Sequence, residues 1–447
     1  MPSTFHGGVH PEDRKKATKH KPVETLMPPH RLIYPLAMHK GTPCESIVQI
    51  GEQVHIGQKI ADSHAMDATP IHAGVSGQVI AIEPYSTPNG IREMSIVIEN
   101  DGQEIMCEKV RPYGSVESLS REDLYAIIRD SGIVGAGGGA FPTHTKINDA
   151  IDVVEMLIVN GCESEPYLTG DHRRMLEAPE EIVGGVRVLA KLLNVDKAII
   201  AVEANKHDAA DVVKRTLPRN GPIQIKIVPH RFPQGSERQL IKAVTGREMP
   251  PGKLPMSVGA VVFNVETVAA IHRAVTMGLP FFQRVVTVAG NAVANAKNLR
   301  VRIGTPFGEL FAATGGFRET PHKIIMGGPM MGVAQHNLRA PVTKSTAGLL
   351  AFTDSLALPK SSGCIRCGRC VRKCPMRLMP LYFYAFEQRN RLSELERMRI
   401  EDCIECGSCA YICPSRLHLV QSICTAKEKI NAMRAKVSKS PLGEREL

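Results

Sequence analysis

SGIVGAGGGAFPTHTKI, at residues 131–147, contains the pattern Gly-x-Gly-x-x-Ala, which begins at Gly135 and ends at Ala140. This pattern is typical of the dinucleotide-binding turn. It indicates such a turn only where it follows a strand and begins a helix. The residues on both sides of the loop therefore decide what kind of fold the loop belongs to.

Neither side of the loop fits a dinucleotide-binding turn. Upstream, Leu124, Ile127 and Ile128 recur at helical spacing, and Ser120 is a suitable N-cap, so a helix is expected where the turn requires a strand. Downstream, the sequence at 141–143 is Phe-Pro-Thr, which cannot smoothly continue a helix. The dinucleotide interpretation is therefore rejected.

A glycine-rich loop remains, and it can still bind a phosphate. Glycines allow backbone N–H groups to approach an anion closely. Lys146 follows a few residues later and can supply the opposite charge. The sequence therefore predicts a phosphate-binding loop of some other kind.

The composition describes a multidomain globular protein. At 447 residues the chain is too long for one ordinary core, and no run approaches the roughly 20 apolar residues of a spanning helix. The N-terminus lacks the apolar segment of a secretory signal, so a cytoplasmic location is expected. The net charge of +10 is compatible with an anionic membrane surface or acidic proteins. Nucleic acid is not expected as a partner, because no basic stripe is interleaved with aromatic residues.

Two cysteine runs have identical spacing, C-x2-C-x2-C-x3-C-P, which is typical of 4Fe–4S clusters in bacterial ferredoxins. Disulfides are a poor alternative in a cytosolic chain, and zinc usually takes paired ligands. In ferredoxins with two clusters, the fourth cysteine of each run ligates the other cluster. The predicted ligands are Cys364, Cys367, Cys370 and Cys413 for one cluster, and Cys403, Cys406, Cys409 and Cys374 for the other.

Residues 44–83 resemble the two halves of a biotinyl/lipoyl hammerhead, with short β-branched strands separated by glycines. A carrier role needs a lysine at the tip of the central hairpin, but Met66 and Asp67 occupy that position. We therefore expect the hammerhead to be structural.

The middle of the chain alternates between strand and helix. Strands are expected at 156–159, 197–203 and 223–229, with helices at 179–193 and 204–217 between them. This rhythm predicts a parallel sheet covered by helices, with ligands at the carboxyl ends of its strands. A further strand is expected to end at Asn264.

Taken together, the motifs resemble the C subunit of the Rnf electron-transport complex over nearly the whole chain. The central part is similar to the flavoprotein subunit of respiratory complex I, which binds FMN with NADH stacked on it. The resemblance rests on GAGGGAFPTHTK, VNGCESEP, FPQGSERQLIKAVTGREMPPGKLP, FNVETVAAI and the double cysteine pattern.

The resemblance implies a multidomain α/β and α+β fold. Its expected parts are a β-rich barrel-sandwich hammerhead (1–115), a Rossmann-like FMN/NADH-binding α/β domain of the complex I flavoprotein type (116–280), a β-grasp SLBB-like module (281–345), a helical two-cluster ferredoxin domain (346–425) and a basic tail (426–447).

The resemblance also assigns binding residues for the flavin, while no catalytic acid or base is expected. The implied cofactor-binding residues are Gly135, Gly137, Gly138, Lys146, Asn160, Glu163, Glu165, Asn264 and Thr267. The first four would hold the phosphate and ribityl region, and the two glutamates would lie near the flavin and the nicotinamide ribose.

The implied activity is NADH-dependent flavin and iron–sulfur oxidoreduction within an ion-translocating NAD–ferredoxin oxidoreductase. The implied cofactors are FMN, two 4Fe–4S clusters and NAD(H). The expected partners are the other Rnf subunits and, indirectly, ferredoxin, at the cytoplasmic face of the membrane. A cobalamin reductase of bacterial microcompartments, which resembles the same family, is the alternative.

Three departures from the family pattern concern the flavin site. The family order Gly-Gly-Ala-Gly-Phe is replaced by Gly-Gly-Gly-Ala-Phe, so Ala140 stands at a position that would be strained if φ were positive. Cys162 replaces an Asp of the complex I subunit, and Phe232 replaces a Tyr.

Overall fold

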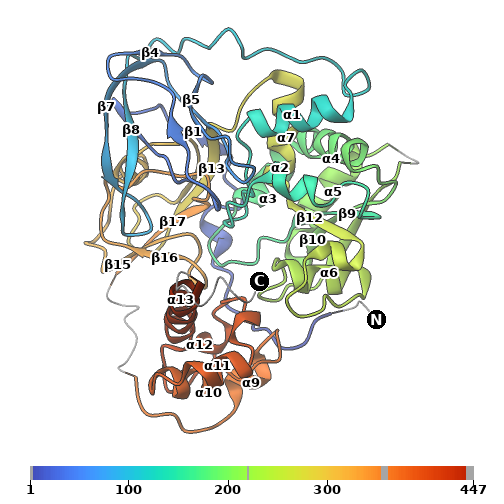
Figure 1. Cartoon of the computed structure of the whole chain (residues 1–447), viewed down its shortest axis with the longest axis vertical. Coiled ribbons are helices and arrows are strands. Elements are labelled where there is room, and N and C mark those ends of the chain that lie inside the picture. The colour runs from blue at the N-terminus through green and yellow to red at the C-terminus, as the bar shows by residue number, and fades with distance from the viewer. Residues whose placement is uncertain (1–3, 219–220, 354–360, 439–447) are drawn as a thin grey trace. The chain divides into compact units, whose positions relative to one another are not determined.

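The computed structural model describes residues 4–218, 221–353 and 361–438, which fall into two compact units (Figure 1). The larger unit consists of Asp13–Val228 and Pro255–Leu356. The smaller unit combines Met1–Glu12, Pro229–Leu254 and Ala357–Leu447. The two short segments far upstream therefore belong with the cysteine runs. The final residues of the expected basic tail, 439–447, lie outside the described residues.

A four-stranded parallel sheet forms the centre of the larger unit, in the order β11-β10-β9-β12. Its strands are β9 (Met156–Gly161), β10 (Ala198–Glu203), β11 (Ile223–Val228) and β12 (Ala260–Asn264). The helices around it are α1 (Arg121–Asp130), α2 (Thr143–Asn148), α3 (Gly170–Glu177), α4 (Pro179–Leu193), α5 (His207–Thr216) and α7 (Val265–Met277). The alternation predicted from the sequence is confirmed. Strands β9, β10 and β12 are short, largely buried runs that are each followed by a helix, whereas β11 is partly exposed.

Helix α1 precedes the glycine loop, as predicted. The Ser120 hydroxyl accepts a hydrogen bond from the Asp123 N–H at 3.0 Å, and the Asp123 carboxylate accepts one from the Ser120 N–H. This reciprocal arrangement satisfies two N–H groups at the start of the helix. Leu124, Ile127 and Ile128 form its buried face.

The N-terminal part of the larger unit is β-rich and contains two small sheets. One has the order β2-β8-β7-β4, with β2 (Arg31–Pro35), β8 (Arg92–Asn100), β7 (Gly77–Ser86) and β4 (Gln53–Val54). The other has the order β3-β5-β6, with β3 (Glu45–Ser46), β5 (Lys59–Asp62) and β6 (Ile71–His72).

A six-stranded mixed sheet completes the larger unit. Its order is β1 (Val23–Thr25), β14 (Lys297–Arg302), β13 (Gln283–Ala289), β17 (Gly348–Phe352), β15 (Lys323–Met326) and β16 (Val333–Gln335). Helix α8 (Phe307–Ala313) contributes Phe307, Leu310 and Phe311 to its core. Within the described ranges, the short 3₁₀ helices are η1 (Lys15–Ala17), η2 (Ala204–Lys206), η3 (Pro255–Val258) and η5 (Ile400–Asp402).

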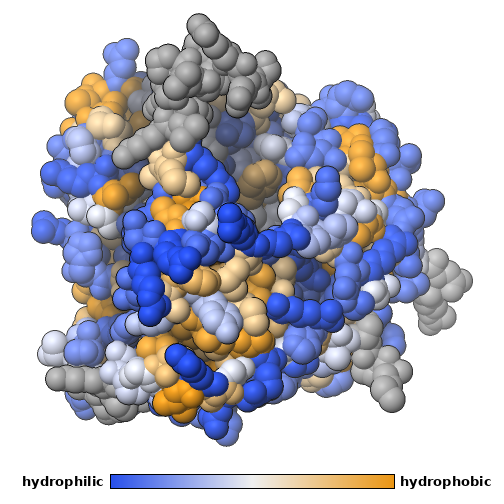
Figure 2. Space-filling view, turned by 60° about the horizontal axis from the view of Figure 1, so that its bottom comes forward, coloured by the Kyte–Doolittle hydropathy of each residue, from blue (hydrophilic) through white to orange (hydrophobic). Residues whose placement is uncertain are grey.

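The smaller unit is helical. Its helices are α6 (Glu237–Thr245), α9 (Arg369–Lys373), α10 (Pro380–Glu387), α11 (Leu392–Arg397), α12 (Ser408–Tyr411) and α13 (Leu419–Ser438). Helices α10 and α11 lie between the two cysteine runs, in keeping with the helical character expected of this domain. Among the described residues, no helix has the length and apolarity required to cross a membrane. Figure 2 shows hydrophilic residues projecting across one face of the molecule, with apolar residues exposed between them.

Candidate functional site

The glycine loop is a closed turn with an exposed tip. The Gly135 N–H donates to the Phe141 carbonyl at 2.9 Å, and the Ala140 N–H donates to the Gly135 carbonyl at 3.1 Å. Residues 137–139 are exposed, and within the described ranges their three N–H groups donate to no protein acceptor. The tip therefore offers a set of available donors of the kind that binds a phosphate.

The backbone N–H and carbonyl groups of Ala136 both anchor this loop to buried side chains. Its N–H donates to the Thr267 hydroxyl at 2.9 Å, and its carbonyl accepts from Arg284 at 3.0 Å. Thr267 and Arg284 are both buried. In the structure, Thr267 thus acts on the loop itself, and Arg284 is a contributor that the sequence analysis missed.

Lys146 extends from α2 toward the end of β12. Its Nζ lies 5.5 Å from the centre of the Phe263 ring, one residue before the strand ends at Asn264. The cation therefore lies near the carboxyl ends of the parallel strands, which form the edge of the sheet at which ligands bind in α/β folds.

Two asparagines predicted as flavin contacts are neighbours on adjacent strands. Asn160 of β9 and Asn264 of β12 are register partners at the carboxyl ends. A methyl group added at Gly137 would lie 3.5 Å from the Asn264 side chain, so the loop tip also meets this edge. The structure thus brings the glycine loop and both asparagines together.

Asp171 also lies at this edge, and the sequence analysis missed it. Its carboxylate accepts from the Asn264 amide at 2.6 Å, while Asn264 caps α7 by accepting from the Glu266 N–H at 2.9 Å. Burial and the nearby Glu163 raise the pKa of Asp171 to about 7. In the sequence, the only sign that Asp171 belongs to this site is its position at the start of the helix that follows the acidic turn.

Glu163 and Glu165 use their carboxylates on backbone N–H groups. Glu163 accepts from Asp171 at 2.9 Å and from His172 at 3.3 Å, at the start of α3. Glu165 accepts from the N–H groups of residues 330 and 331 at 3.0 and 2.8 Å, and burial raises its pKa to about 7. Both therefore shape the loop after β9, and each carboxylate retains lone pairs for a ligand.

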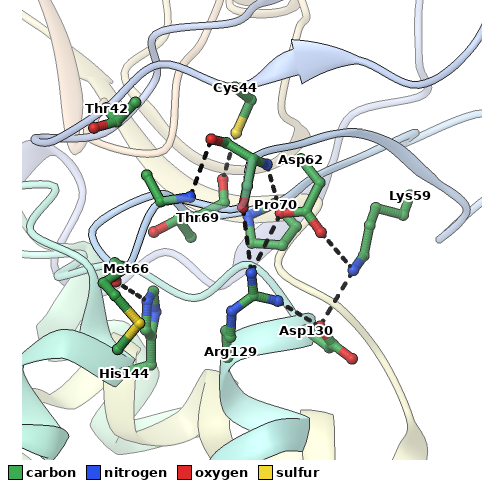
Figure 3. A network of polar contacts seen from close by, with 12 residues as sticks. Thr42, Cys44, Lys59, Asp62, Met66, Thr69, Pro70, Arg129, Asp130 and His144 are labelled. Carbon is green, nitrogen blue, oxygen red and sulfur yellow. Dashed lines mark hydrogen bonds and ion pairs between the residues drawn. The ribbon is translucent and has the colours of Figure 1, made fainter.

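The N-terminal β domain supports the helices that flank the glycine loop (Figure 3). The Met66 carbonyl, at the hairpin tip, accepts from His144 of α2 at 3.0 Å. Lys59 forms ion pairs with Asp62 at 2.8 Å and with Asp130 of α1 at 3.2 Å. The hairpin tip is thus packed against α2, in keeping with a structural hammerhead.

In the smaller unit, the eight motif cysteines surround two hollows in a crossed arrangement. The first hollow, of about 360 Å³ including its open mouth, is lined by Cys364, Cys367, Cys370 and Cys413. The second, of about 340 Å³ on the same measure, is lined by Cys374, Cys403, Cys406 and Cys409. Each set combines three cysteines of one run with the last cysteine of the other.

Both cysteine runs fold with the same backbone. Arg366 and Glu405, which precede the second cysteine of each run, both have φ of +55°. Gly368 and Gly407, which follow that cysteine, also have positive φ. These left-handed residues turn the chain tightly, so three cysteines face one hollow.

The second hollow suits thiolates that bind a cationic group. The Leu378 N–H lies 3.3 Å from the Cys374 sulfur, and the Glu405 N–H lies 3.4 Å from the Cys403 sulfur. Burial raises the pKa of the Cys403 thiol to about 12. Crowded buried thiolates therefore require positive charge beside them, which iron in a cluster provides.

The two hollows differ in exposure and charge. Cys364 is exposed, and Ile365 beside it is 67% exposed, whereas three of the four cysteines around the second hollow are buried. The first run carries the exposed Arg366, Arg369 and Arg372, and the equivalent positions of the second run hold Glu405, Ser408 and Tyr411.

Other segments of the smaller unit enclose the second hollow further. The Gly8 N–H donates to the Lys373 carbonyl at 2.9 Å, and the Gln239 amide of α6 lies 3.5 Å from the Pro375 carbonyl. These contacts support the backbone on both sides of Cys374, which forms one corner of the second hollow.

Four family models match successive parts of the chain. They are the RnfC barrel sandwich hybrid domain (3–103), the Nuo51 FMN-binding domain (128–273), the SLBB domain (285–334) and the 4Fe-4S dicluster domain (363–417).

Curated relatives match nearly the whole chain. The chain is 42% identical to the C subunit of the Na⁺-translocating ferredoxin:NAD⁺ oxidoreductase complex of Acetobacterium woodii, over 97% of this chain and 98% of that protein. It is 43% identical to the C subunit of the proton-translocating complex of Clostridium ljungdahlii, over 88% and 86% of the two chains. It is 40% identical to the C subunit of the ion-translocating oxidoreductase complex of Rhodobacter capsulatus, over 97% and 84%.

Among solved structures, an NAD⁺-reducing [NiFe]-hydrogenase in the air-oxidized state is similar in fold. The TM-score is 0.51 at 17% identity, and the match covers 72% of this chain and 65% of that chain. This likeness concerns the fold alone.

Proposed function

The chain belongs to the C-subunit family of ion-translocating ferredoxin:NAD⁺ oxidoreductase complexes, and on that basis we propose that it exchanges hydride between NAD(H) and FMN and relays single electrons through two 4Fe–4S clusters. It is an electron-transfer oxidoreductase with an FMN-binding and a 4Fe–4S dicluster domain. Its partners are the other subunits of the complex, with ferredoxin as an indirect partner. It is peripheral, at the cytoplasmic face of the membrane.

The crossed cysteine hollows carry this proposal. Their lining supports Cys364, Cys367, Cys370 and Cys413 as ligands of one cluster, and Cys374, Cys403, Cys406 and Cys409 as ligands of the other. The crossing makes each cluster depend on both runs, so the module holds its two clusters together as one relay.

The edge of the parallel sheet supports the flavin site. The available N–H groups of residues 137–139 and the Lys146 ammonium are suited to the phosphate. Asn160 and Asn264 present amide groups that can orient the flavin. Gly135 and Thr267 contribute by shaping the loop, and Glu163 and Glu165 by ordering the turn after β9.

The same proposal covers the domain layout. The β-rich part (1–115) acts as a hammerhead that supports the flavin domain (116–280). The β-grasp module (281–345), the two-cluster module (346–425) and the tail (426–447) follow along the chain. The family matches support the four folded parts. The grouping of 229–254 with the cysteines refines it, because that segment supports the Cys374 corner.

The protein's own residues bind, orient and shield the reactants. Bound FMN supplies the conversion between a two-electron hydride and single electrons. No side chain is needed as a general acid or base for the hydride itself. The loop amides hold the phosphate end, and the thiolates hold the electron acceptors.

Analysis of the purified full-length chain tests this function. We expect one FMN and about eight iron atoms per chain, which is the content of two 4Fe–4S clusters, and NADH oxidation with an artificial one-electron acceptor. Absence of flavin from protein with intact clusters would refute the flavin assignment.

Membrane attachment tests the assignment to the complex. With partner subunits present, the chain should co-purify with membranes and be released only in part by high salt, because salt screens exposed charge pairs while apolar contacts persist. Recovery solely from a microcompartment fraction would instead favour a cobalamin reductase.

A further inference from the structure

Lys15 is a buried lysine of η1 whose ammonium group is surrounded by backbone carbonyls. It is 2% exposed. Its Nζ donates to the carbonyls of Glu163 at 2.9 Å and Glu165 at 2.8 Å, and also to that of Leu168. All three acceptors belong to the loop that follows β9 and carries the two glutamates of the flavin site.

Adjacent residues of the N-terminal segment hold the same loop. The Tyr167 N–H donates to the Asp13 carbonyl at 2.8 Å, and Tyr167 has φ of +69°, which is unfavourable for a non-glycine residue. The Thr169 hydroxyl donates to the Thr18 hydroxyl at 2.8 Å. The segment 13–18 thus contacts both the middle and the end of the loop.

The chemistry of the ammonium group explains why a lysine occupies this place. A lysine side chain carries three donors and no acceptor, so it can serve three converging carbonyls at once. Burial lowers the pKa of Lys15 to about 8, with Glu163, Glu203 and Asp13 opposing that shift and Lys206 adding to it. The Lys206 ammonium lies 3.3 Å from the same Glu163 carbonyl.

We infer that Lys15 is a positioning residue of the flavin–nicotinamide site, which sets the backbone of residues 163–168 so that Glu163 and Glu165 keep their places at the sheet edge. This inference rests on the proposed function of that edge. Lys15 touches no reactant and acts only through the loop. A segment remote in sequence thereby controls nucleotide binding.

The main test is Lys15→Met, with Lys16→Met as the matched control because Lys16 is the exposed neighbour in the same 3₁₀ helix. In the full chain, we expect Lys15→Met to weaken FMN about tenfold to a hundredfold and to raise the KM for NADH. Iron content should stay unchanged. Amide hydrogen exchange should accelerate at Tyr167 in this variant and not in Lys16→Met.

A second variant separates positioning from general destabilisation. Lys15→Ala leaves room for a small amine, so ethylammonium chloride should restore FMN affinity and Tyr167 protection, while sodium chloride at equal ionic strength should not. Unchanged FMN affinity in Lys15→Met would overturn the inference. Failure of both Lys15 variants to fold, beside a folded Lys16→Met, would overturn it in favour of a purely structural lysine.

Failure of the proposed function gives a different result. In that case wild-type protein would bind no FMN, while the exchange rate at Tyr167 would still report whether Lys15 holds the loop.

Discussion

Under the proposed function, the cysteine hollows and the glycine loop would hold their cofactors by different means. Around each hollow, four cysteine side chains from two separate runs would provide the contacts through their thiolates, the usual protein ligands of 4Fe–4S clusters. At the loop tip, the contacts would come from the backbone N–H groups of residues 137–139, a group that every residue except proline has. One site depends on side-chain identity and the other on backbone shape.

Because of this difference, the two sites should respond differently to substitution. Loss of one thiolate should remove a whole cluster, whereas the flavin site should lose affinity in steps as individual supports are removed. The following substitutions test this contrast, beginning with the largest expected effect.

Cys374→Ser should abolish the cluster of Cys403, Cys406 and Cys409 while the other cluster remains. Cys374 lines that hollow although it belongs to the other run. Cys370→Ser, in the same run, should instead abolish the first cluster. EPR spectroscopy with iron counting distinguishes the two variants. Loss of the same cluster in both would contradict crossed ligation.

Glu266→Gln should have the next largest effect, on the folding of the flavin domain. Glu266 pairs with Arg174 at 2.6 Å and Arg273 at 2.9 Å among buried helices. Burial alone would raise its pKa, but the two guanidinium groups overcome this and lower the pKa to about 2. Removing the charge should lower the free energy of unfolding at pH 7 by about 3 kcal/mol.

The pH dependence gives a second readout for Glu266. Its folded pKa lies below the ordinary carboxyl value, so its contribution is complete above about pH 4.5 and is lost as pH falls toward 2. Denaturation curves should therefore show a smaller acid-induced loss in Glu266→Gln than in wild type. The control is Glu180→Gln, since Glu180 is exposed at the start of α4, and its acid-induced loss of stability should match that of wild type. Equal acid denaturation curves for the two variants would argue against the buried network around Glu266.

Lys146→Ala should weaken FMN about tenfold to a hundredfold, because a charge-assisted hydrogen bond contributes on the order of 1.5–3 kcal/mol. Both clusters should remain. Lys197→Ala is the control, because it removes an exposed positive charge just before β10, at the opposite end of the strands. Titration with FMN measures both variants, and equal affinities would exclude Lys146 from the site.

Local patterns in the sequence predicted much of the fold. The helix capped by Ser120, the strand at Met156 and the helix at 179–193 follow from capping residues and apolar spacing within a few residues of each other. The expected crossed cysteine sets agree with the lining of the two hollows because the motif repeats with fixed spacing.

Long-range contacts could not be predicted in this way. Lys15 contacts a loop almost 150 residues later in the chain, and Asp171 reaches Asn264 across the sheet edge. Neither pair leaves a periodic or spacing signal in the sequence. The same applies to α6, because nothing in its sequence indicates that it contacts the segment beside the second cysteine hollow.

Ala140→Gly should have the smallest effect and tests the backbone side of the contrast. Ala140 has φ of +47°, which costs an L-residue roughly 1–2 kcal/mol that glycine avoids. Against this, glycine loses a buried methyl group, worth about 0.8 kcal/mol, and about 0.4–1 kcal/mol of backbone entropy. The opposing contributions nearly cancel, so the free energy of unfolding should change by less than about 1 kcal/mol. FMN affinity should stay within about threefold, because the N–H groups of residues 137–139 keep their positions.

Ala140→Val should be clearly destabilising, since a β-branched residue tolerates positive φ poorly. Thermal unfolding and FMN titration of the two variants decide the matter: a stable valine variant would mean that the loop does not hold this left-handed turn in solution.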